Sequence, residues 1–199
     1  MPPDRDLAAF EARAAGYEQG WLGRLHHEIA DRTADLTLKA QPSPQRLLDV
    51  GCGTGYLLRS LASRCPEADG LAGVDPAPAM IEAATAFADD PRLRFSVGVA
   101  EELPYPDGHF DLVVSSTSFD HWSDQQGGLR ECRRVLRPGG RLVLVDQFSL
   151  WLTPTLFVGR RGKARTKGRA NRLLGAAGFQ SPTWHDLYAV IIKAVTATS

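Results

Sequence analysis

The chain has 199 residues, of which 43% are hydrophobic and 23% are charged, a balance typical of one soluble globular domain. Its 23 Lys and Arg residues match its 23 Asp and Glu residues, so the net charge gives no support to a polyanion-binding protein. No run approaches the roughly 18 apolar residues that span a bilayer, and the polar start MPPDRD lacks the apolar core of a signal peptide. We therefore expect no membrane partner.

The three cysteines, Cys52, Cys65 and Cys132, are widely spaced and odd in number. They form no CxxC pair or Cys/His cluster, so we expect no metal site. Free thiols are typical of a reducing compartment, which predicts a cytoplasmic protein. Nothing in the sequence specifies the oligomeric state.

The chain is expected to form one domain, 1–199, that begins with a helical lid over 1–45. Residues 6–40 are typical of one or two helices, and Pro42-Ser43-Pro44 breaks that pattern. A cofactor-binding core is expected over 46–146, followed by a substrate-side segment over 147–199.

Five short apolar runs alternate with amphipathic stretches in the core and are expected to be strands. Most are nearly continuous in Leu, Val and Ala, as in parallel strands covered on both faces. One run, Leu93–Val97, alternates strictly and is expected near a sheet edge. The pattern predicts an α/β fold with a doubly wound, mostly parallel sheet, a Rossmann-like arrangement. The five runs are Arg46–Val50, Gly70–Val74, Leu93–Val97, Asp111–Ser115 and Arg141–Val145.

Helical stripes lie between the runs, with apolar residues near the 3.6-residue period. The sequence Arg137-Pro138-Gly139-Gly140 is expected to end the third helix, because proline cannot continue a helix and glycine permits positive φ. The stripes are Leu57, Leu58 and Leu61; Met80, Ile81, Ala84, Phe87 and Ala88; and Leu129, Cys132, Val135 and Leu136.

The C-terminal part predicts one helix and a β-hairpin. Lys167–Ala177 has a helical pattern, and Gly178 follows as its stop. Strand-like pieces around Thr183-Trp184 and over Tyr188–Val195 are expected to pair. The preceding stretch 147–166 begins apolar and ends basic, which is consistent either with a wall of the substrate pocket or with a core helix followed by a solvated loop.

A glycine-rich turn, Leu48–Gly55 (LDVGCGTG), follows the first strand directly and leads into a helix. Its glycines permit a sharp bend and leave room for a ligand against the main chain. Open α/β sheets bind ligands at this edge. Asp75, at the end of the next run, is placed to accept hydrogen bonds from both ribose hydroxyls of an adenosine group. Because the spacing is G-x-G-x-G and not G-x-G-x-x-G, the loop favours S-adenosylmethionine over a dinucleotide.

These motifs, in this order, resemble those of class I S-adenosylmethionine-dependent methyltransferases, the broad family that includes ubiquinone/menaquinone-biosynthesis-like and many small-molecule enzymes. The resemblance covers about residues 46–146. It is carried by LLDVGCGTG, by GVDPAPAMI with Asp75, by VAEELPYPD followed by FDLVV, and by LRECRRVLRPGGRLVLV.

The resemblance implies roles for particular residues. Asp49 and the glycine loop would surround the methionine part of the cofactor, and Asp75 would hold the ribose. Tyr17 either reaches the cofactor's carboxylate or packs within an aromatic helix face. Many relatives carry an acid at the position of Val99, which leaves the adenine contact open. The implied cofactor-binding residues are Tyr17, Asp49, Gly51, Cys52, Gly53, Gly55, Asp75, Pro76, Met80, Ala100, Glu101, Ser116 and Thr117.

Methyl transfer needs alignment of nucleophile, methyl group and sulfur more than it needs a universal catalytic residue. His121, just after the fourth strand, is the candidate general base, with a structural role in a helical turn as the alternative. Two adjacent imidazoles, His26 and His27, are not expected on one helix face.

The predicted function is methyl transfer to a small-molecule acceptor with S-adenosylhomocysteine as product. A cofactor-binding protein without turnover is one alternative, and a nicotinamide-dependent reductase is another. The target-base motif of a nucleic-acid methyltransferase is absent after the fourth strand, where Ser115-Ser116-Thr117-Ser118 stands, so no nucleic-acid partner is expected.

Overall fold

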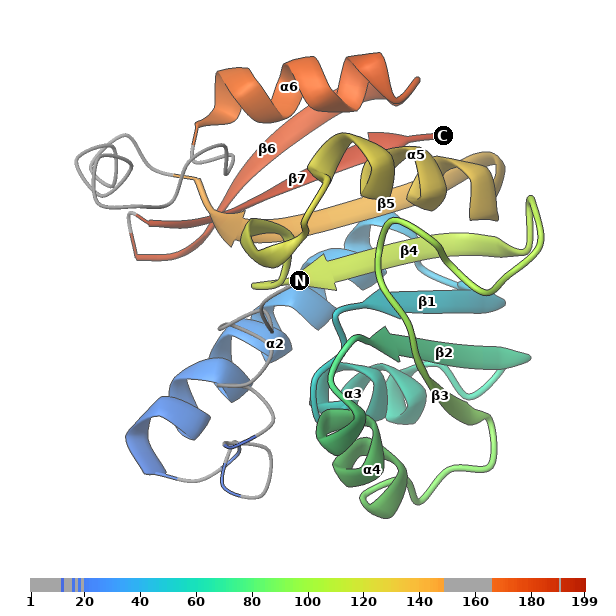
Figure 1. The fold of residues 1–199 in the computed structure, drawn as a ribbon, viewed down its shortest axis with the longest axis vertical. Helices are drawn as coiled ribbons and strands as arrows, with labels where there is room; N and C mark the ends of the chain where they lie inside the picture. Colours follow the sequence, from blue (N-terminus) through green and yellow to red (C-terminus); the bar gives the residue numbers. More distant parts are fainter. Residues whose placement is uncertain (1–11, 13–15, 17, 19, 149–165, 190) are drawn as a thin grey trace.

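The computed structural model describes residues 12, 16, 18, 20–148, 166–189 and 191–199. Seven strands in this part of the chain form one sheet in the order β3-β2-β1-β4-β5-β7-β6 (Figure 1). The pairs among β1 to β5 are parallel, whereas β7 pairs antiparallel with both β5 and β6. The strands are β1 (Arg46–Val50), β2 (Gly70–Asp75), β3 (Leu93–Val97), β4 (Phe110–Ser116), β5 (Leu136–Gln147), β6 (Gln180–Tyr188) and β7 (Ile192–Thr198).

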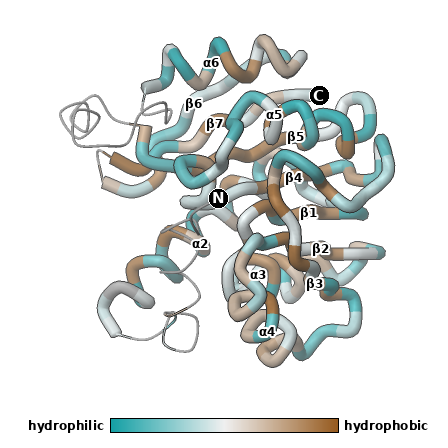
Figure 2. Tube along the Cα trace, viewed as in Figure 1, coloured by the Kyte–Doolittle hydropathy of each residue, from teal (hydrophilic) through white to brown (hydrophobic). Residues whose placement is uncertain are grey.

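Helices cover both faces of the sheet, so neighbouring residues of one strand are buried in opposite directions. Leu47 packs in the core with α2 (Gly20–Ala40), α3 (Tyr56–Arg64) and α4 (Pro78–Ala86). Leu48 packs on the other face with α5 (Gln125–Val135) and α6 (Lys167–Ala176). Figure 2 shows apolar and polar residues alternating along α6, as expected for a helix with one buried side. The predicted doubly wound sheet is confirmed.

The predicted positions of several elements are confirmed as well. β3 lies at one edge of the sheet, as its alternating pattern indicated. The C-terminal strands form the expected antiparallel pair. Helix α6 ends at Ala176, and Gly178 has a φ of 89°, the left-handed conformation in which glycine commonly terminates helices.

Two details of the sequence interpretation are wrong. Helix α5 ends at Val135, just ahead of Arg137–Gly140 as predicted, but β5 already begins at Leu136 and not at the predicted Arg141. Phe110 pairs with Leu136 and Leu112 with Arg141, so the extra residues of β5 form a bulge. Phe87 was assigned to a buried stripe, yet it is 49% exposed because α4 ends at Ala86.

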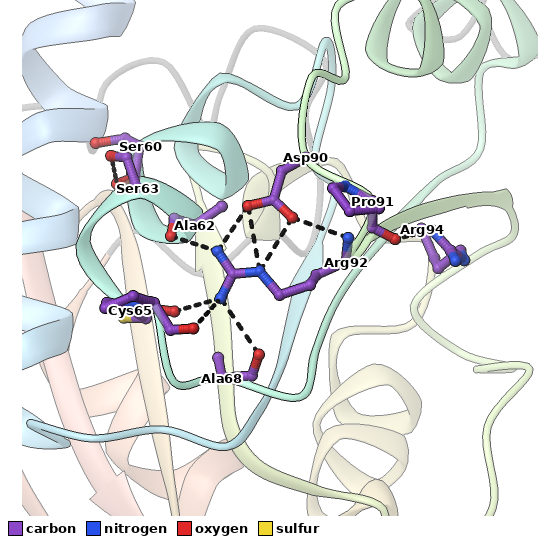
Figure 3. A network of polar contacts seen from close by, with 10 residues as sticks. Ser60, Ala62, Ser63, Cys65, Ala68, Asp90, Pro91, Arg92 and Arg94 are labelled. Carbon is purple, nitrogen blue, oxygen red and sulfur yellow. Dashed lines mark hydrogen bonds and ion pairs between the residues drawn. The ribbon is translucent and has the colours of Figure 1, made fainter.

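At the amino-terminal edge of the sheet, charged side chains form several hydrogen bonds that hold neighbouring elements together. Ahead of β3, the Arg92 guanidinium bonds both carboxylate oxygens of Asp90 and donates to main-chain carbonyls at the end of α3 (Figure 3). Its Nη2 lies 2.8 Å from the carbonyl oxygen of Ala62, and its Nη1 lies 2.5 Å from that of Cys65. The last carbonyls of a helix have no partner within the helix, and Arg92 supplies N–H donors to them.

Asp111, at the start of β4, also satisfies backbone groups at this edge. Its side chain is buried and accepts hydrogen bonds from the backbone N–H of Gln45 at 2.7 Å and of Arg46 at 3.1 Å. The Arg137 guanidinium lies 3.3 Å from the same carboxylate. The charge of Asp111 is therefore compensated from several directions.

None of the helices in the described residues is long and apolar enough to cross a membrane. The three cysteines are free and buried.

Candidate functional site

A cavity of about 260 Å³ opens at the carboxyl ends of β1, β2 and β4. The strand order reverses between β1 and β4, and open α/β sheets bind ligands at such a switch point. The predicted site residues that line this one cavity are Asp49, Gly51, Cys52, Gly53, Asp75, Pro76, Met80, Ala100, Glu101, Ser116, Thr117 and His121.

Two predicted residues do not join that set. Gly55 is not among the residues that line the cavity. It precedes α3 with a φ of 78°, and a Cβ there would lie 2.7 Å from the Phe95 ring. Its small size therefore serves packing between α3 and β3. Tyr17 lies outside the described residues.

The other two loop glycines also differ in purpose. A Cβ at Gly51 would meet the Ser118 side chain, 2.0 Å from its Oγ. Ser118 Oγ donates to the carbonyl of Val50 and accepts from the Trp122 indole N–H, so this space is already filled by the protein. A Cβ at Gly53 would meet nothing within 4 Å. Of the three glycines, Gly53 is the one that leaves open space for a ligand.

Asp75 closes the glycine loop onto the end of β2. Its Oδ2 accepts the backbone N–H of Gly53 at 2.9 Å, and its Oδ1 accepts that of Ala77 at 3.0 Å. Burial raises the pKa of Asp75, and these two hydrogen bonds oppose that rise. The carboxylate thus shapes the loop and borders the cavity at once.

Asp49, near the end of β1, has far less support. Its side chain is 2% exposed, and no described residue gives its Oδ1 a hydrogen bond. Burial and the nearby charge of Asp75 raise the pKa of Asp49 to about 8. A buried acid without partners at a ligand-binding edge is typical of a functional site. A cationic ligand would satisfy it.

The charged groups around the cavity are mostly acidic. Four carboxylates border it, and its described lining contains no lysine or arginine. Such a lining favours a cation and opposes the pyrophosphate of a dinucleotide. Within the described residues, His, Cys, Asp and Glu do not gather in any group of three that could hold a metal. The four acids are Glu18, Asp49, Asp75 and Glu101.

The cavity wall beyond β4 is a short 3-10 helix, η2 (Phe119–His121), which carries His121. Asp146, at the end of β5, holds η2 by accepting the backbone N–H of Asp120 at 2.9 Å. Burial raises the pKa of Asp146 to about 6, while backbone hydrogen bonds and His121 act in the opposite direction. Thr117, which precedes η2, has a φ of 54°. That conformation is strained for a β-branched residue, and strain of this kind is concentrated at functional sites.

Sequence reasoning missed Glu18. Its carboxylate accepts the hydroxyl of Thr54 at 2.6 Å and pairs with the Arg59 guanidinium at 2.8 Å. Burial alone would raise the pKa of Glu18, but these partners lower it overall. Glu18 thereby joins the N-terminal segment to the glycine loop and to α3. Glu18 follows Tyr17 directly, in the segment predicted to form a helical lid. That prediction was the available signal that Glu18 lies near the site.

His26 and His27 both line the cavity from α2, although their rings were not expected on one helix face. One turn of α2 borders the cavity, and adjacent side chains on a helix point about 100° apart, so the two imidazoles need not share one face. The His27 ring stacks on Tyr56 at 3.8 Å between centroids, and its Nε2 lies 3.4 Å from Glu18.

Comparison with known proteins agrees with this site. A methyltransferase domain family matches residues 48–144, the span from β1 through most of β5. The malonyl-[acyl-carrier protein] O-methyltransferase of Hahella chejuensis is 38% identical over 149 residues, which are 75% of this chain and 50% of that protein. From β1 to β5 the chain is therefore similar to methyltransferase domains. This similarity supports the predicted cofactor class, S-adenosylmethionine.

Two further proteins are similar to this chain, one in sequence and one in fold. The demethylmenaquinone methyltransferase of Deinococcus radiodurans is 38% identical over 133 residues, 66% of this chain and 51% of that protein. A methyltransferase solved in complex with the Haloferax volcanii activator Trm112 has the same fold, with a TM-score of 0.79, 21% identity and coverage of 95% of this chain and 96% of that one. The chain spans about half the length of the two relatives matched by sequence.

Proposed function

We propose that this chain transfers the methyl group of S-adenosylmethionine to a small-molecule acceptor. The observation that carries the proposal is the acidic cavity at the switch point of the sheet, whose described lining holds four carboxylates and no lysine or arginine. The donor is a cation, and this lining favours it over the anionic nicotinamide dinucleotides. When bound, it supplies a methyl group activated by sulfonium sulfur.

The residues of the chain then have to bind and align. Asp75 is proposed to hold the ribose, in addition to the loop that it already fixes. Asp49 and Gly53 are proposed to border the methionine part, since they offer an unpartnered carboxyl oxygen and open space. The proposed adenine neighbours are Pro76, Met80, Ala100 and Glu101, and Ser116 and Thr117 are proposed to lie nearest the sulfur.

His121 remains the candidate general base. It lines the cavity from η2, which Asp146 anchors to the end of β5. A proton acceptor at this place is required only for an acceptor that has to lose its proton early. Most of the rate is proposed to come from alignment, which supplies on the order of 7–11 kcal/mol in well-oriented reactions.

A small-molecule acceptor is supported by the name of the Deinococcus radiodurans relative, which acts on demethylmenaquinone. The Hahella chejuensis relative acts on a malonyl group that is attached to a carrier protein. The missing target-base motif after β4 supports the exclusion of nucleic acid. A cytoplasmic location is proposed from the three free, buried cysteines.

Calorimetric titration tests the proposal. We expect S-adenosylmethionine and S-adenosylhomocysteine to bind, NADH not to bind, and Asp75→Ala to weaken both ligands by about tenfold to hundredfold, the value of a charge-assisted hydrogen bond. Binding of NADH, or of neither adenosyl compound, would contradict it. Mass spectrometry of acceptor mixtures then separates an enzyme from a protein that binds the cofactor without turnover.

A further inference from the structure

Asp49 differs from the other acids of the cavity in the support that it receives. Asp75 accepts two backbone N–H groups, and Glu18 accepts the Thr54 hydroxyl and the Arg59 guanidinium. Glu101 accepts the backbone N–H of Asp124 at 2.7 Å. Asp49 is 2% exposed, and its Oδ1 receives nothing from the described residues. Ionising this group without a ligand would leave a bare buried charge.

The groups around Asp49 do not supply the missing cation. Acids face the cavity from the N-terminal segment (Glu18), from β2 (Asp75) and from the loop after β3 (Glu101). The Cys52 thiol and the Tyr56 hydroxyl border it as well, and burial raises the pKa of each. The remaining titratable neighbours are three imidazoles, His26 and His27 on α2 and His121 on η2.

We infer that Asp49 is neutral in the free protein and ionises when the cationic methyl donor binds, which makes this residue select the donor over its product, which lacks the sulfonium charge. The inference rests on the proposed function. Donor and product share their amino and carboxylate groups, and they differ by the positive charge on sulfur. A buried carboxylate with an unpartnered oxygen is the group in the cavity whose charge responds most to that difference.

The proton balance is simple. On donor binding the O–H bond of Asp49 breaks, its electron pair stays on the carboxylate, and the proton passes to solvent. After methyl transfer the positive charge has left the sulfur, and Asp49 takes a proton back from solvent. The product then lies beside a neutral Asp49, and the attraction between the carboxylate and the sulfonium charge is gone. This loss favours product release.

Proton release on binding is measured by calorimetry in buffers of different ionisation enthalpy. At about pH 7 we expect the wild-type protein to release about one proton for each S-adenosylmethionine that binds. For each S-adenosylhomocysteine it should release at most about half a proton. The affinity for the donor should rise about tenfold per pH unit and level off above about pH 8, the pKa of Asp49 in the free protein.

Two variants assign the proton. Asp49→Asn mimics the neutral acid, so it should fold, release no proton and lose most of the preference for the donor. Asp111→Asn removes an equally buried carboxylate that already has partners and lies outside the cavity, and it should keep the proton release. Equal release with donor and product, or release that persists in Asp49→Asn, would overturn the inference while leaving the proposed function standing. Failure of the donor to bind at all would overturn both.

Discussion

The two edges of the sheet treat buried acids in opposite ways. At the amino-terminal edge, Asp111 is buried and receives two backbone N–H groups and the Arg137 guanidinium. At the carboxyl edge, Asp49 is equally buried, and its Oδ1 has no partner among the described residues. Charge that is fully compensated stabilises a fold, whereas charge that lacks compensation is available to a ligand. The same residue type thus serves structure at one edge and is proposed to serve binding at the other.

Arg92 extends the comparison. Its guanidinium completes the carbonyls at the end of α3 and leaves little hydrogen-bonding capacity for anything else (Figure 3). The carboxyl edge has no such clamp in its described lining, and its acids Asp49, Asp75 and Asp146 all have raised pKa values because they are buried. The proposed binding edge therefore carries less compensated charge than the amino-terminal edge.

The largest expected effect concerns the glycine loop of the carboxyl edge. Gly51→Ala should lower the free energy of unfolding by about 2–5 kcal/mol, because its Cβ would clash with Ser118 and its φ is 78°. Gly53→Ala is the matched control and should cost about 1–2 kcal/mol, from left-handed strain alone. It should nevertheless weaken the cofactor, since its Cβ enters open space. Urea unfolding followed by circular dichroism measures both, and equal losses would show that the loop glycines share one role.

The next effect compares the two edges directly. Asp49→Asn should raise the free energy of unfolding by on the order of 1–4 kcal/mol at about pH 7, because it removes a buried acid whose folded pKa is raised. Asp111→Asn should lower it by about 1–3 kcal/mol, because it weakens a compensated network, and it should leave ligand affinity unchanged. Destabilisation by both substitutions would remove the distinction between the edges.

The pH dependence of stability sharpens the comparison further. Asp49 and Asp146 have folded pKa values of about 8 and about 6, both above the unfolded value near 3.9. The folded state therefore binds more protons, and the associated stability is present below about pH 4 and is lost as pH rises through the two folded values. Between about pH 6 and 8, Asp49→Asn should flatten the decline by about 1.4 kcal/mol per pH unit. An unchanged slope in urea unfolding would exclude a raised pKa for Asp49.

The smallest effect is expected at Glu18. Glu18→Gln keeps an acceptor for the Thr54 hydroxyl but loses the charge that pairs with Arg59. Because the pair is partly exposed, we expect a loss of less than about 1 kcal/mol in stability and at most about fivefold in cofactor affinity. Thr54→Val removes the hydroxyl and serves as the partner variant. A loss of more than tenfold in Glu18→Gln would mean that the carboxylate contacts the ligand itself.

Much of the fold could be predicted because each core strand is buried on both faces and its apolar run stands out. β1 was predicted with its observed bounds, Arg46–Val50. The start of β5 could not be predicted, since Arg137–Gly140 has the composition of a turn and its pairing with the start of β4 is a long-range property. Phe87 was misplaced because periodicity does not show where a helix ends.

The candidate site was predicted where local motifs carry it. The glycine loop and Asp75 could be read from spacing, and both border the cavity. The separate purposes of Gly51, Gly53 and Gly55 could not, because each depends on which side chain or open space faces the glycine in three dimensions. Glu18 was missed for the same reason, since its contacts with Thr54 and Arg59 span 36 and 41 residues.

The position of β7 has a consequence for synthesis. β7 lies between β5 and β6, so neither neighbour completes its hydrogen bonds until residues 192–198 have left the ribosome. Until then β5 presents a bare edge, the kind of surface that pairs with other chains and promotes aggregation. The parallel strands that border the cavity all emerge earlier. The parallel part of the sheet can therefore assemble first, and the edge of β5 stays open to pairing with other chains until β7 inserts beside it.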